Sequence, residues 1–251
     1  MRYFALATDY DGTIAQHSLV DENTLEALRR FRDSGRKLIL VTGRELSDLR
    51  NVFPALDLFD RIVAENGALL YRPASGEEKV LAQPPPEAFV QTLRQRGVAS
   101  LSVGHVIVAT HEPYESVVLE SIRELGLELQ VIFNKGAVMV LPSGVNKASG
   151  LRAALAELGI SAHNLVGVGD AENDHAFLEL CKCAVAVANA LPALKERADF
   201  TTVKDHGAGV TELIDLILRD DLQSMEARLV RHKITLGVGR DDKEIQTAAQ
   251  R

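Results

Sequence analysis

Tryptophan is absent from the 251-residue sequence, and aromatic residues make up only 5% of it. So few aromatic side chains disfavour the base-stacking surfaces that bind single-stranded nucleic acid. Cysteine occurs only at Cys181 and Cys183, which is too few for a disulfide framework. A C-x-C pair without further nearby ligands is also a poor zinc site, so we expect a structural role for both cysteines. These absences favour a reducing, cytoplasmic location.

Long apolar runs are also missing. No uninterrupted run approaches the roughly 18 residues of a membrane span, and the amino-terminal stretch reaches Asp9 too early for a secretory signal. The net charge of −7 disfavours a protein that binds nucleic acid by neutralising phosphates. Hydrophobic residues reach 46% and charged residues 25%, as in ordinary globular proteins, which excludes intrinsic disorder. We expect neither a nucleic-acid nor a membrane partner.

Short apolar runs alternate with segments of helical spacing at both ends of the chain. Residues 3–8, 37–41 and 164–168 are predicted strands, whereas residues 21–34 and 147–158 place their apolar side chains on one helical face. Strands of about five residues that alternate with amphipathic helices predict an α/β fold. The expected core is a Rossmann-like, mostly parallel sheet formed by residues 1–81 and 144–219.

The middle of the chain has a different pattern. Between Pro84-Pro85-Pro86 and Pro142-Ser143-Gly144, a helix–strand–strand pattern occurs twice. It predicts a small α+β domain over residues 82–143, inserted into the core. Residues 220–251 form a tail of unclear role, with a helix expected over 219–230 and a strand over 232–237. An unpaired strand needs a cover, so the tail could begin a further domain or contact another subunit.

Three apolar runs end abruptly at polar residues, namely Asp9, Thr42 and Asp170. In an open α/β sheet, ligands bind beyond the carboxyl ends of the strands. Asp9 and Asp11 alternate along extended chain and therefore point the same way. Two close carboxylates suit a divalent cation such as Mg²⁺, a nucleophile and a proton carrier. Taken alone, the pair is more typical of solvated acids at a strand-to-turn boundary, because such pairs are common.

An acidic pair, Asp170 and Asp174, and a lysine, Lys147, are further candidates for a site at this edge of the sheet. Asp170 and Asp174 lie four residues apart, on one face of a helix expected over 172–180, although Asp170 is also a good N-cap. Lys147 begins a helix, where the helix dipole disfavours a cation. A bound phosphate among several acids would explain that placement, whereas an exposed surface lysine is the simpler alternative. Together these residues are the parts that phosphoryl transfer requires.

Four motifs in this order resemble those of the haloacid dehalogenase (HAD) superfamily. Asp9-Tyr10-Asp11-Gly12-Thr13 is similar to its first motif, Val41-Thr42-Gly43-Arg44 to its second, Lys147 to its third, and residues 169–174 to its fourth. The insert between the second and third motifs, with Glu65-Asn66-Gly67-Ala68, resembles the Cof-type (class IIB) phosphatases. Its size is similar to that in phosphoglycolate and sucrose-phosphate phosphatases.

The resemblance implies Mg²⁺-dependent hydrolysis of a small phosphomonoester, a sugar phosphate or a phosphoglycolate-like acid, through an aspartyl-phosphate. The implied catalytic residues are Asp9, Asp11, Thr42 and Lys147; the implied phosphate-binding residues are Gly12, Thr13, Gly43, Arg44 and Asn173; the implied metal-binding residues are Asp9, Asp11 through its main-chain carbonyl, Asp170 and, in support, Asp174. The insert would act as a cap, with His105, His111, Glu112, Asn134 and Lys135 as polar candidates for substrate contact. A phosphotransferase or phosphomutase, and a non-catalytic sensor of phosphorylated ligands, remain alternatives.

Overall fold

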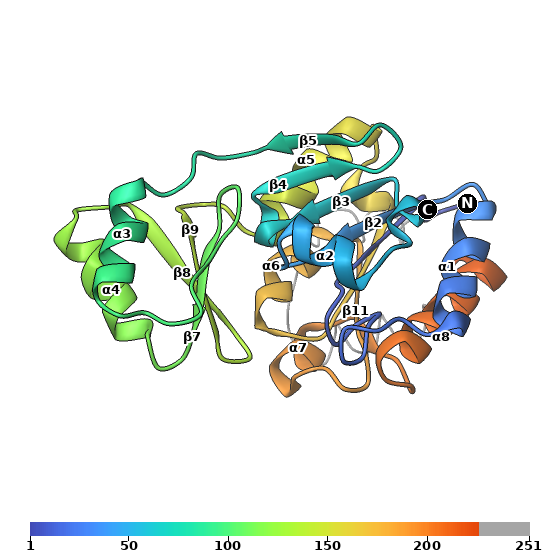
Figure 1. Ribbon diagram of the computed structural model, residues 1–251. Helices are drawn as coiled ribbons and strands as arrows, with labels where there is room; N and C mark the ends of the chain where they lie inside the picture. Colours follow the sequence, from blue (N-terminus) through green and yellow to red (C-terminus); the bar gives the residue numbers. More distant parts are fainter. Residues whose placement is uncertain (226–251) are drawn as a thin grey trace, which may run out of the picture.

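A large mixed sheet forms the centre of the molecule in the computed structural model, which describes residues 1–225 (Figure 1). Its strands are β1 (Ala5–Thr8), β2 (Lys37–Val41), β3 (Arg61–Ala64), β4 (Leu69–Arg72), β5 (Glu77–Val80), β10 (Leu165–Gly169), β11 (Cys183–Ala186) and β12 (Phe200–Thr201). Their order is β12-β11-β10-β1-β2-β3-β4-β5. The pairs from β12 to β3 are parallel, and β4 and β5 are antiparallel additions. The predicted α/β fold with a mostly parallel sheet is confirmed.

Helices cover both faces of this sheet. They are α1 (Glu22–Asp33), α2 (Leu46–Val52), α5 (Lys147–Leu158), α6 (His175–Leu180), α7 (Pro192–Arg197) and α8 (His206–Asp220). The connection through α1 moves from β1 to β2, and the one through α6 moves the opposite way, from β10 to β11. Since such crossovers are right-handed, α1 and α6 lie on opposite faces. α8 packs beside α1, and α5 packs beside α6.

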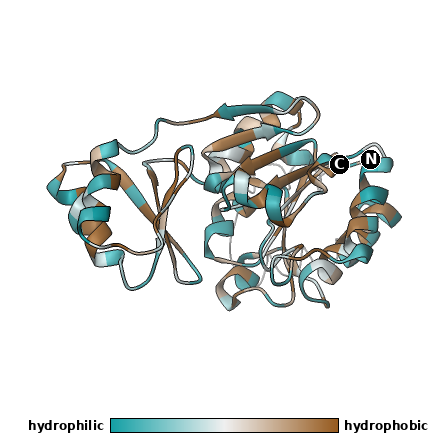
Figure 2. Cartoon of the chain, in the orientation of Figure 1, coloured by the Kyte–Doolittle hydropathy of each residue, from teal (hydrophilic) through white to brown (hydrophobic). Residues whose placement is uncertain are grey.

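Local sequence explains why α1 begins and ends where it does. The Asp21 carboxylate accepts a hydrogen bond from the Thr24 backbone N–H at 3.0 Å and so caps the first turn. Leu28 and Phe31 are fully buried on the inner face. Gly35 follows with a φ of +86°, which glycine adopts without strain. In Figure 2 the central strands are mainly hydrophobic and the helices show hydrophilic residues on the outside.

The second sheet has four strands in the order β6-β7-β9-β8. They are β6 (Ser102–Val103), β7 (Val108–His111), β8 (Leu129–Asn134) and β9 (Ala137–Pro142), accompanied by α3 (Glu87–Gln95) and α4 (Glu115–Glu124). The two helices cover the face turned away from the large sheet (Figure 1). Phe89 and Leu93 of α3 and Val118 of α4 are buried in one apolar cluster with strand residues of this sheet. All six elements fall within residues 82–143.

Some predicted elements differ from the structure. The helix expected over 172–180 is a 3₁₀ turn, η4 (Glu172–Asp174), followed by α6, because the Asp174 carboxylate binds the backbone of the preceding loop. The helix expected to continue over 219–230 stops at Asp220, the last residue of α8, since Asp221 is left-handed (φ +52°) and its carboxylate pairs with Arg36. Residues 226–230 of that expected helix lie outside the described residues. α7 and β12 were not predicted. The strand expected over 232–237 lies outside the described residues. Among residues 1–225, no helix has the length and apolar character needed to cross a membrane.

Candidate active site

The ends of three neighbouring strands create the site. β1 lies between β10 and β2, and Thr8 is in register with Val168 on one side and Leu40 on the other. All three strands are parallel, so their carboxyl ends meet at one edge of the sheet. Asp9, Asp170 and Thr42 follow β1, β10 and β2 directly, at the edge where the sequence pattern places a ligand site.

Asp9, the first residue of the first motif, is buried, at 4% exposure. Its Oδ1 atom lies 2.6 Å from the Nζ atom of Lys147, and its Oδ2 atom accepts a hydrogen bond from the Thr13 hydroxyl at 3.2 Å. Burial and the nearby Asp174 charge raise the pKa of Asp9 well above its usual range, against the opposing effect of Lys147. A buried carboxylate with one strong cationic partner is chemically suited to attack an electrophile once its charge is supported.

Lys147 is fully enclosed at the start of α5, with 1% exposure, so it is not a surface lysine. Its Nζ atom bridges Asp9 and Asp174, at 2.6 Å from each. These two carboxylates raise the pKa of Lys147 despite the opposing effect of burial, so the group stays cationic. The helix itself is capped by Asn146, whose side chain accepts from Ala148 N and Ser149 N. The ammonium balances the charge of the two acids, and these acids in turn offset its unfavourable interaction with the positive end of the helix dipole.

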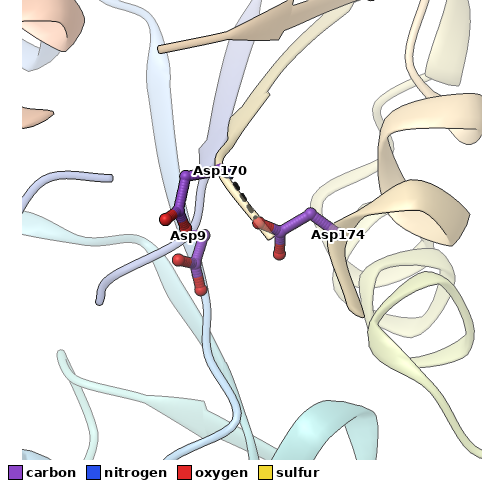
Figure 3. Close-up of side chains that lie close together, drawn as sticks. All are labelled: Asp9, Asp170 and Asp174. Carbon is purple, nitrogen blue, oxygen red and sulfur yellow. Dashed lines mark hydrogen bonds between the residues drawn. The ribbon is translucent and has the colours of Figure 1, made fainter. Parts of the chain in front are cut away.

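Asp174 holds the fourth-motif loop in place. Its Oδ2 atom accepts hydrogen bonds from the backbone N–H groups of Asp170 and Ala171, at 2.8 and 3.0 Å (Figure 3). The capping relationship is thus the reverse of the one considered from sequence, in which Asp170 was the cap. A Cβ atom at Gly169 would lie 2.6 Å from that same Oδ2 atom, so the close approach requires glycine.

Three aspartates have the donor chemistry of a Mg²⁺ site. One carboxylate oxygen from each of Asp9, Asp170 and Asp174 lies within 4.8 Å of the others, and Figure 3 shows Asp9 and Asp170 side by side. Such oxygen donors suit a hard divalent cation, which would also relieve their mutual repulsion. Both Asp174 oxygens are already engaged, by Lys147 and by backbone amides. The oxygens of Asp9 and Asp170 accept hydrogen bonds from the side chains of Lys147, Thr13 and Lys135 rather than from loop backbone. Asp9 and Asp170 fit a metal as ligands, and Asp174, which fixes the loop backbone, fits as their support.

Arg44 and Asp11 form a close pair at the edge of the site. Arg44 Nε and Nη2 lie 2.6 and 2.7 Å from the two Asp11 carboxylate oxygens, and Arg44 Nη1 lies 2.6 Å from Asp48. The guanidinium and the carboxylate thus form a bidentate ion pair with two hydrogen bonds, a geometry that is stronger and more specific than a single contact. The structure thus places Arg44, which the sequence suggested for phosphate binding, on the proposed proton carrier.

The remaining predicted residues surround these groups. Thr42 is 1% exposed, and its Oγ1 atom accepts from Arg44 N at 3.1 Å. Gly12 has a φ of +85°, and a Cβ atom there would lie 2.2 Å from Asp170 Oδ2. The buried Oδ1 atom of Asn173 has no hydrogen-bond partner within residues 1–225, whereas its Nδ2 atom donates to Asn66 at 3.2 Å. An orphaned buried oxygen beside a cavity is ready for a donor from a ligand.

A cavity of about 430 Å³ lies between the two sheets, beside these residues. From the large sheet it is lined by Asp9, Asp11, Gly43, Arg44, Lys147 and Asn173, and from the second sheet by Ser100, Ser102, Thr110, His111, Asn134 and Met139, among others. Of the five polar candidates in the insert, His111 and Asn134 line this cavity. Lys135 reaches Asp170 instead, at 2.6 Å, and His105 contacts Glu65. Glu112 does not line it.

Two buried residues next to the site were given no role by the sequence analysis. Glu65 and Asn66, noted only as part of a family-like stretch, are fully buried next to the site. Both have positive φ angles, 51° and 53°, which is unusual for residues other than glycine. Two successive buried polar residues directly after a strand were the available signal in the sequence.

The raised pKa of Asp9 predicts a specific pH dependence of stability in metal-stripped protein. A carboxyl whose native pKa lies above its unfolded value of about 4 binds more protons when folded, so stability falls as the pH rises through that interval. We expect the free energy of unfolding of the wild type to fall between pH 5 and 8, and Asp9→Asn to flatten this fall. Urea unfolding with chelator present measures it, with the exposed Asp33→Asn as the control for loss of one charge. Equal slopes in wild type and Asp9→Asn would contradict the assignment.

Comparisons with known proteins agree with the site geometry. The model of the haloacid dehalogenase-like hydrolase family matches residues 6–98 and 99–214. A phosphoglycolate phosphatase of Methanothermobacter thermautotrophicus is 31% identical over 219 residues, which span 84% of this chain and 96% of that protein. Phosphoglycolate phosphatase 2 of Saccharolobus solfataricus is 30% identical, over 85% of this chain and 91% of that protein.

Solved structures share the fold at lower identity. A Thermoplasma acidophilum protein superposes with a TM-score of 0.73 at 15% identity, covering 86% of this chain and 98% of that one. The sucrose-phosphatase of a Synechocystis species, solved with sucrose and phosphate, gives a TM-score of 0.64 at 22% identity, over 86% and 98%. With the family match over most of its length, this chain belongs to the haloacid dehalogenase-like hydrolases and is a phosphatase of that superfamily.

Proposed function

We propose that the chain is a Mg²⁺-dependent phosphomonoester hydrolase that acts on a small phosphorylated metabolite through an aspartyl-phosphate on Asp9. The observation that carries the proposal is the buried Asp9–Lys147–Asp174 arrangement beside the cavity. A protein that only binds phosphate has no need for a buried carboxylate there, because that carboxylate would repel the ligand.

The residues that fit the metal are the carboxylates of Asp9 and Asp170, together with the Asp11 main-chain carbonyl. Bound there, Mg²⁺ would supply positive charge for the phosphate oxygens. Lys147 would add a second positive charge next to Asp9. The Thr42 hydroxyl, the Gly43 backbone and the Asn173 side chain would position the phosphoryl group.

The residues divide the chemistry into two steps. In the first, an Asp9 carboxylate oxygen attacks phosphorus, the ester P–O bond breaks, and Asp11 gives its proton to the leaving oxygen. In the second, Asp11 takes a proton from water, the water oxygen attacks phosphorus, and the bond between phosphorus and Asp9 breaks. Inorganic phosphate leaves, and both aspartates return to their starting state. For this role Asp11 must separate from Arg44, so substrate binding would break that ion pair.

The size and lining of the cavity favour a small polar substrate. Hydroxyl, imidazole and amide groups from residues 82–143 face the phosphate site, so this insert would serve as a cap over a core of residues 1–81 and 144–219. Relatives named phosphoglycolate phosphatase and sucrose-phosphatase support a phosphorylated acid or sugar as the substrate class.

Metal removal tests the proposal directly. We expect phosphate release from a panel of sugar phosphates and 2-phosphoglycolate to fall to background after chelation and to recover with excess Mg²⁺. The same chelator saturated with Mg²⁺ beforehand is the control. Unchanged release in chelator would contradict the metal dependence. A phosphorylated isomer as product, with no inorganic phosphate, would contradict hydrolysis and favour a phosphomutase.

A further inference from the structure

A buried carboxylate joins the large sheet to the cap sheet, away from the reacting groups. Glu65 lies in the 3₁₀ turn η2 (Glu65–Gly67), directly after β3, and is completely enclosed. Its Oε2 atom accepts hydrogen bonds from Val106 N and Ile107 N, at 2.8 and 3.0 Å. Its Oε1 atom accepts from His105 N at 2.9 Å and from the His105 ring Nδ1 at 3.1 Å. Four donors from one turn of the insert thus converge on one side chain.

The turn over residues 104–107 is shaped to receive this carboxylate. A Cβ atom on Gly104 would lie 2.8 Å from the Glu65 Cδ atom, so only glycine allows the approach. Next to it, Val106, Ile107 and Met139 of the insert pack with Ala68, just after η2, in a separate apolar cluster. Polar and apolar contacts therefore close over the same small area, and the charge is fully hydrogen-bonded where it is buried.

The other side of the η2 turn contacts the loops that carry catalytic residues. Glu65 N donates to the Arg44 carbonyl at 2.9 Å, and Asn66 N donates to the Thr42 carbonyl at 3.0 Å. A Cβ atom on Gly67 would lie 1.9 Å from the carbonyl oxygen of Asn146, the residue before Lys147. One rigid turn therefore contacts the second-motif loop, the start of α5 and the insert.

We propose that Glu65 is a positioning residue that fastens the turn over residues 104–107 and so sets the closed position of the cap above the cavity. Ile107, at the end of that turn, and Ala109 line the cavity wall, so releasing the turn opens the substrate site. The fastening stands on geometry alone, whereas its effect on catalysis rests on the proposed phosphatase function. Loss of the contact lowers the fraction of molecules in the closed, binding-competent state.

Glu65→Gln is the sharpest variant. It keeps the size of the side chain, but either orientation of the amide places an NH₂ group against at least one backbone N–H donor of residues 105–107. Hydrogen exchange should then be faster by about tenfold or more at the amides of residues 105–107, because charge-assisted hydrogen bonds are lost. Glu78→Gln is the matched control, since Glu78 is partly exposed and reaches only the outer nitrogen of the same His105 ring, at 3.3 Å, and Arg50. Wild-type protection of these amides in Glu65→Gln would overturn the proposal.

Kinetics separate positioning from general damage. When fewer molecules are closed, the apparent affinity falls by that fraction, so we expect KM to rise about tenfold while kcat stays within about twofold. Partial unfolding would instead lower kcat and leave KM unchanged. Glu65→Asp keeps both acceptor oxygens and should recover part of the loss. An unchanged KM in Glu65→Gln overturns the catalytic part of the proposal.

Gly104→Ala tests the same contact from the cap side, should Glu65→Gln fail to fold. Its methyl group would meet the buried carboxylate, so the same loss of protection and rise in KM are expected. Normal protection in this variant overturns the proposal. If the wild type releases no phosphate from any ester, the proposed function fails, whereas exchange at residues 105–107 still decides whether Glu65 fastens the cap.

Discussion

Asp9→Asn will reduce phosphate release by a factor on the order of 10⁴ or more, because the amide cannot serve as the nucleophile. Asparagine has nearly the same shape, and Lys147 retains Asp174 as a partner at 2.6 Å, so the variant should fold. The measurement is the initial rate of phosphate release at saturating ester and Mg²⁺.

Two controls accompany this variant. Asp33→Asn removes an exposed aspartate at the end of α1 that does not line the cavity, and it should retain full turnover. Near-ultraviolet circular dichroism should be alike in the wild type and in Asp9→Asn. Residual turnover above about 10% of the wild type in a deamidation-free preparation would contradict covalent catalysis by Asp9.

Lys147→Met will have the largest effect on stability, together with loss of activity. It leaves Asp9 and Asp174 buried without their shared cation, and removing one partner of a buried ion pair costs about 3–5 kcal/mol. Urea unfolding in the presence of chelator measures the change. The variant also loses the cation that would support the phosphoryl group, so its turnover should fall to background.

Lys135→Met is the matched control for that experiment. It removes the same charge from a lysine whose side chain is 49% exposed and pairs with Asp170. Only Asp170 of this pair is buried, and Lys135 does not bridge two buried acids as Lys147 does. The unfolding midpoint should therefore fall clearly less than in Lys147→Met. Equal destabilisation by the two variants would contradict the structural role assigned to Lys147.

The spacing of apolar residues predicted most of the helices and strands, because an element that buries one face needs apolar residues at that spacing. The strand expected over 37–41 and the helix expected over 147–158 match β2 and α5. The helix expected over 172–180 is confirmed as α6 (His175–Leu180) and is wrong over 172–174, since the Asp174 carboxylate accepts hydrogen bonds from the loop amides of Asp170 and Ala171. With this contact, residues 172–174 form a 3₁₀ turn instead of α-helix. The spacing of apolar residues does not indicate such a contact between a side chain and the backbone.

The site was predicted where it depends on topology and missed where it depends on side-chain packing. Strand ends at Asp9, Thr42 and Asp170 had to meet if the sheet was parallel. The bidentate Arg44–Asp11 pair depends on distances between loops that spacing cannot specify. The same holds for Glu65, whose partners lie about 40 residues further along the chain.

Trapping the covalent intermediate tests the central claim most directly. The wild type, mixed with a turned-over phosphate ester and Mg²⁺ and quenched in acid within the first turnovers, should carry a phosphoryl group on the peptide that contains Asp9. Borohydride reduction of the acyl phosphate should convert that residue to homoserine, which mass spectrometry detects. Turnover of the ester with no phosphoryl group on this peptide, or with one on a different residue, would contradict catalysis through Asp9.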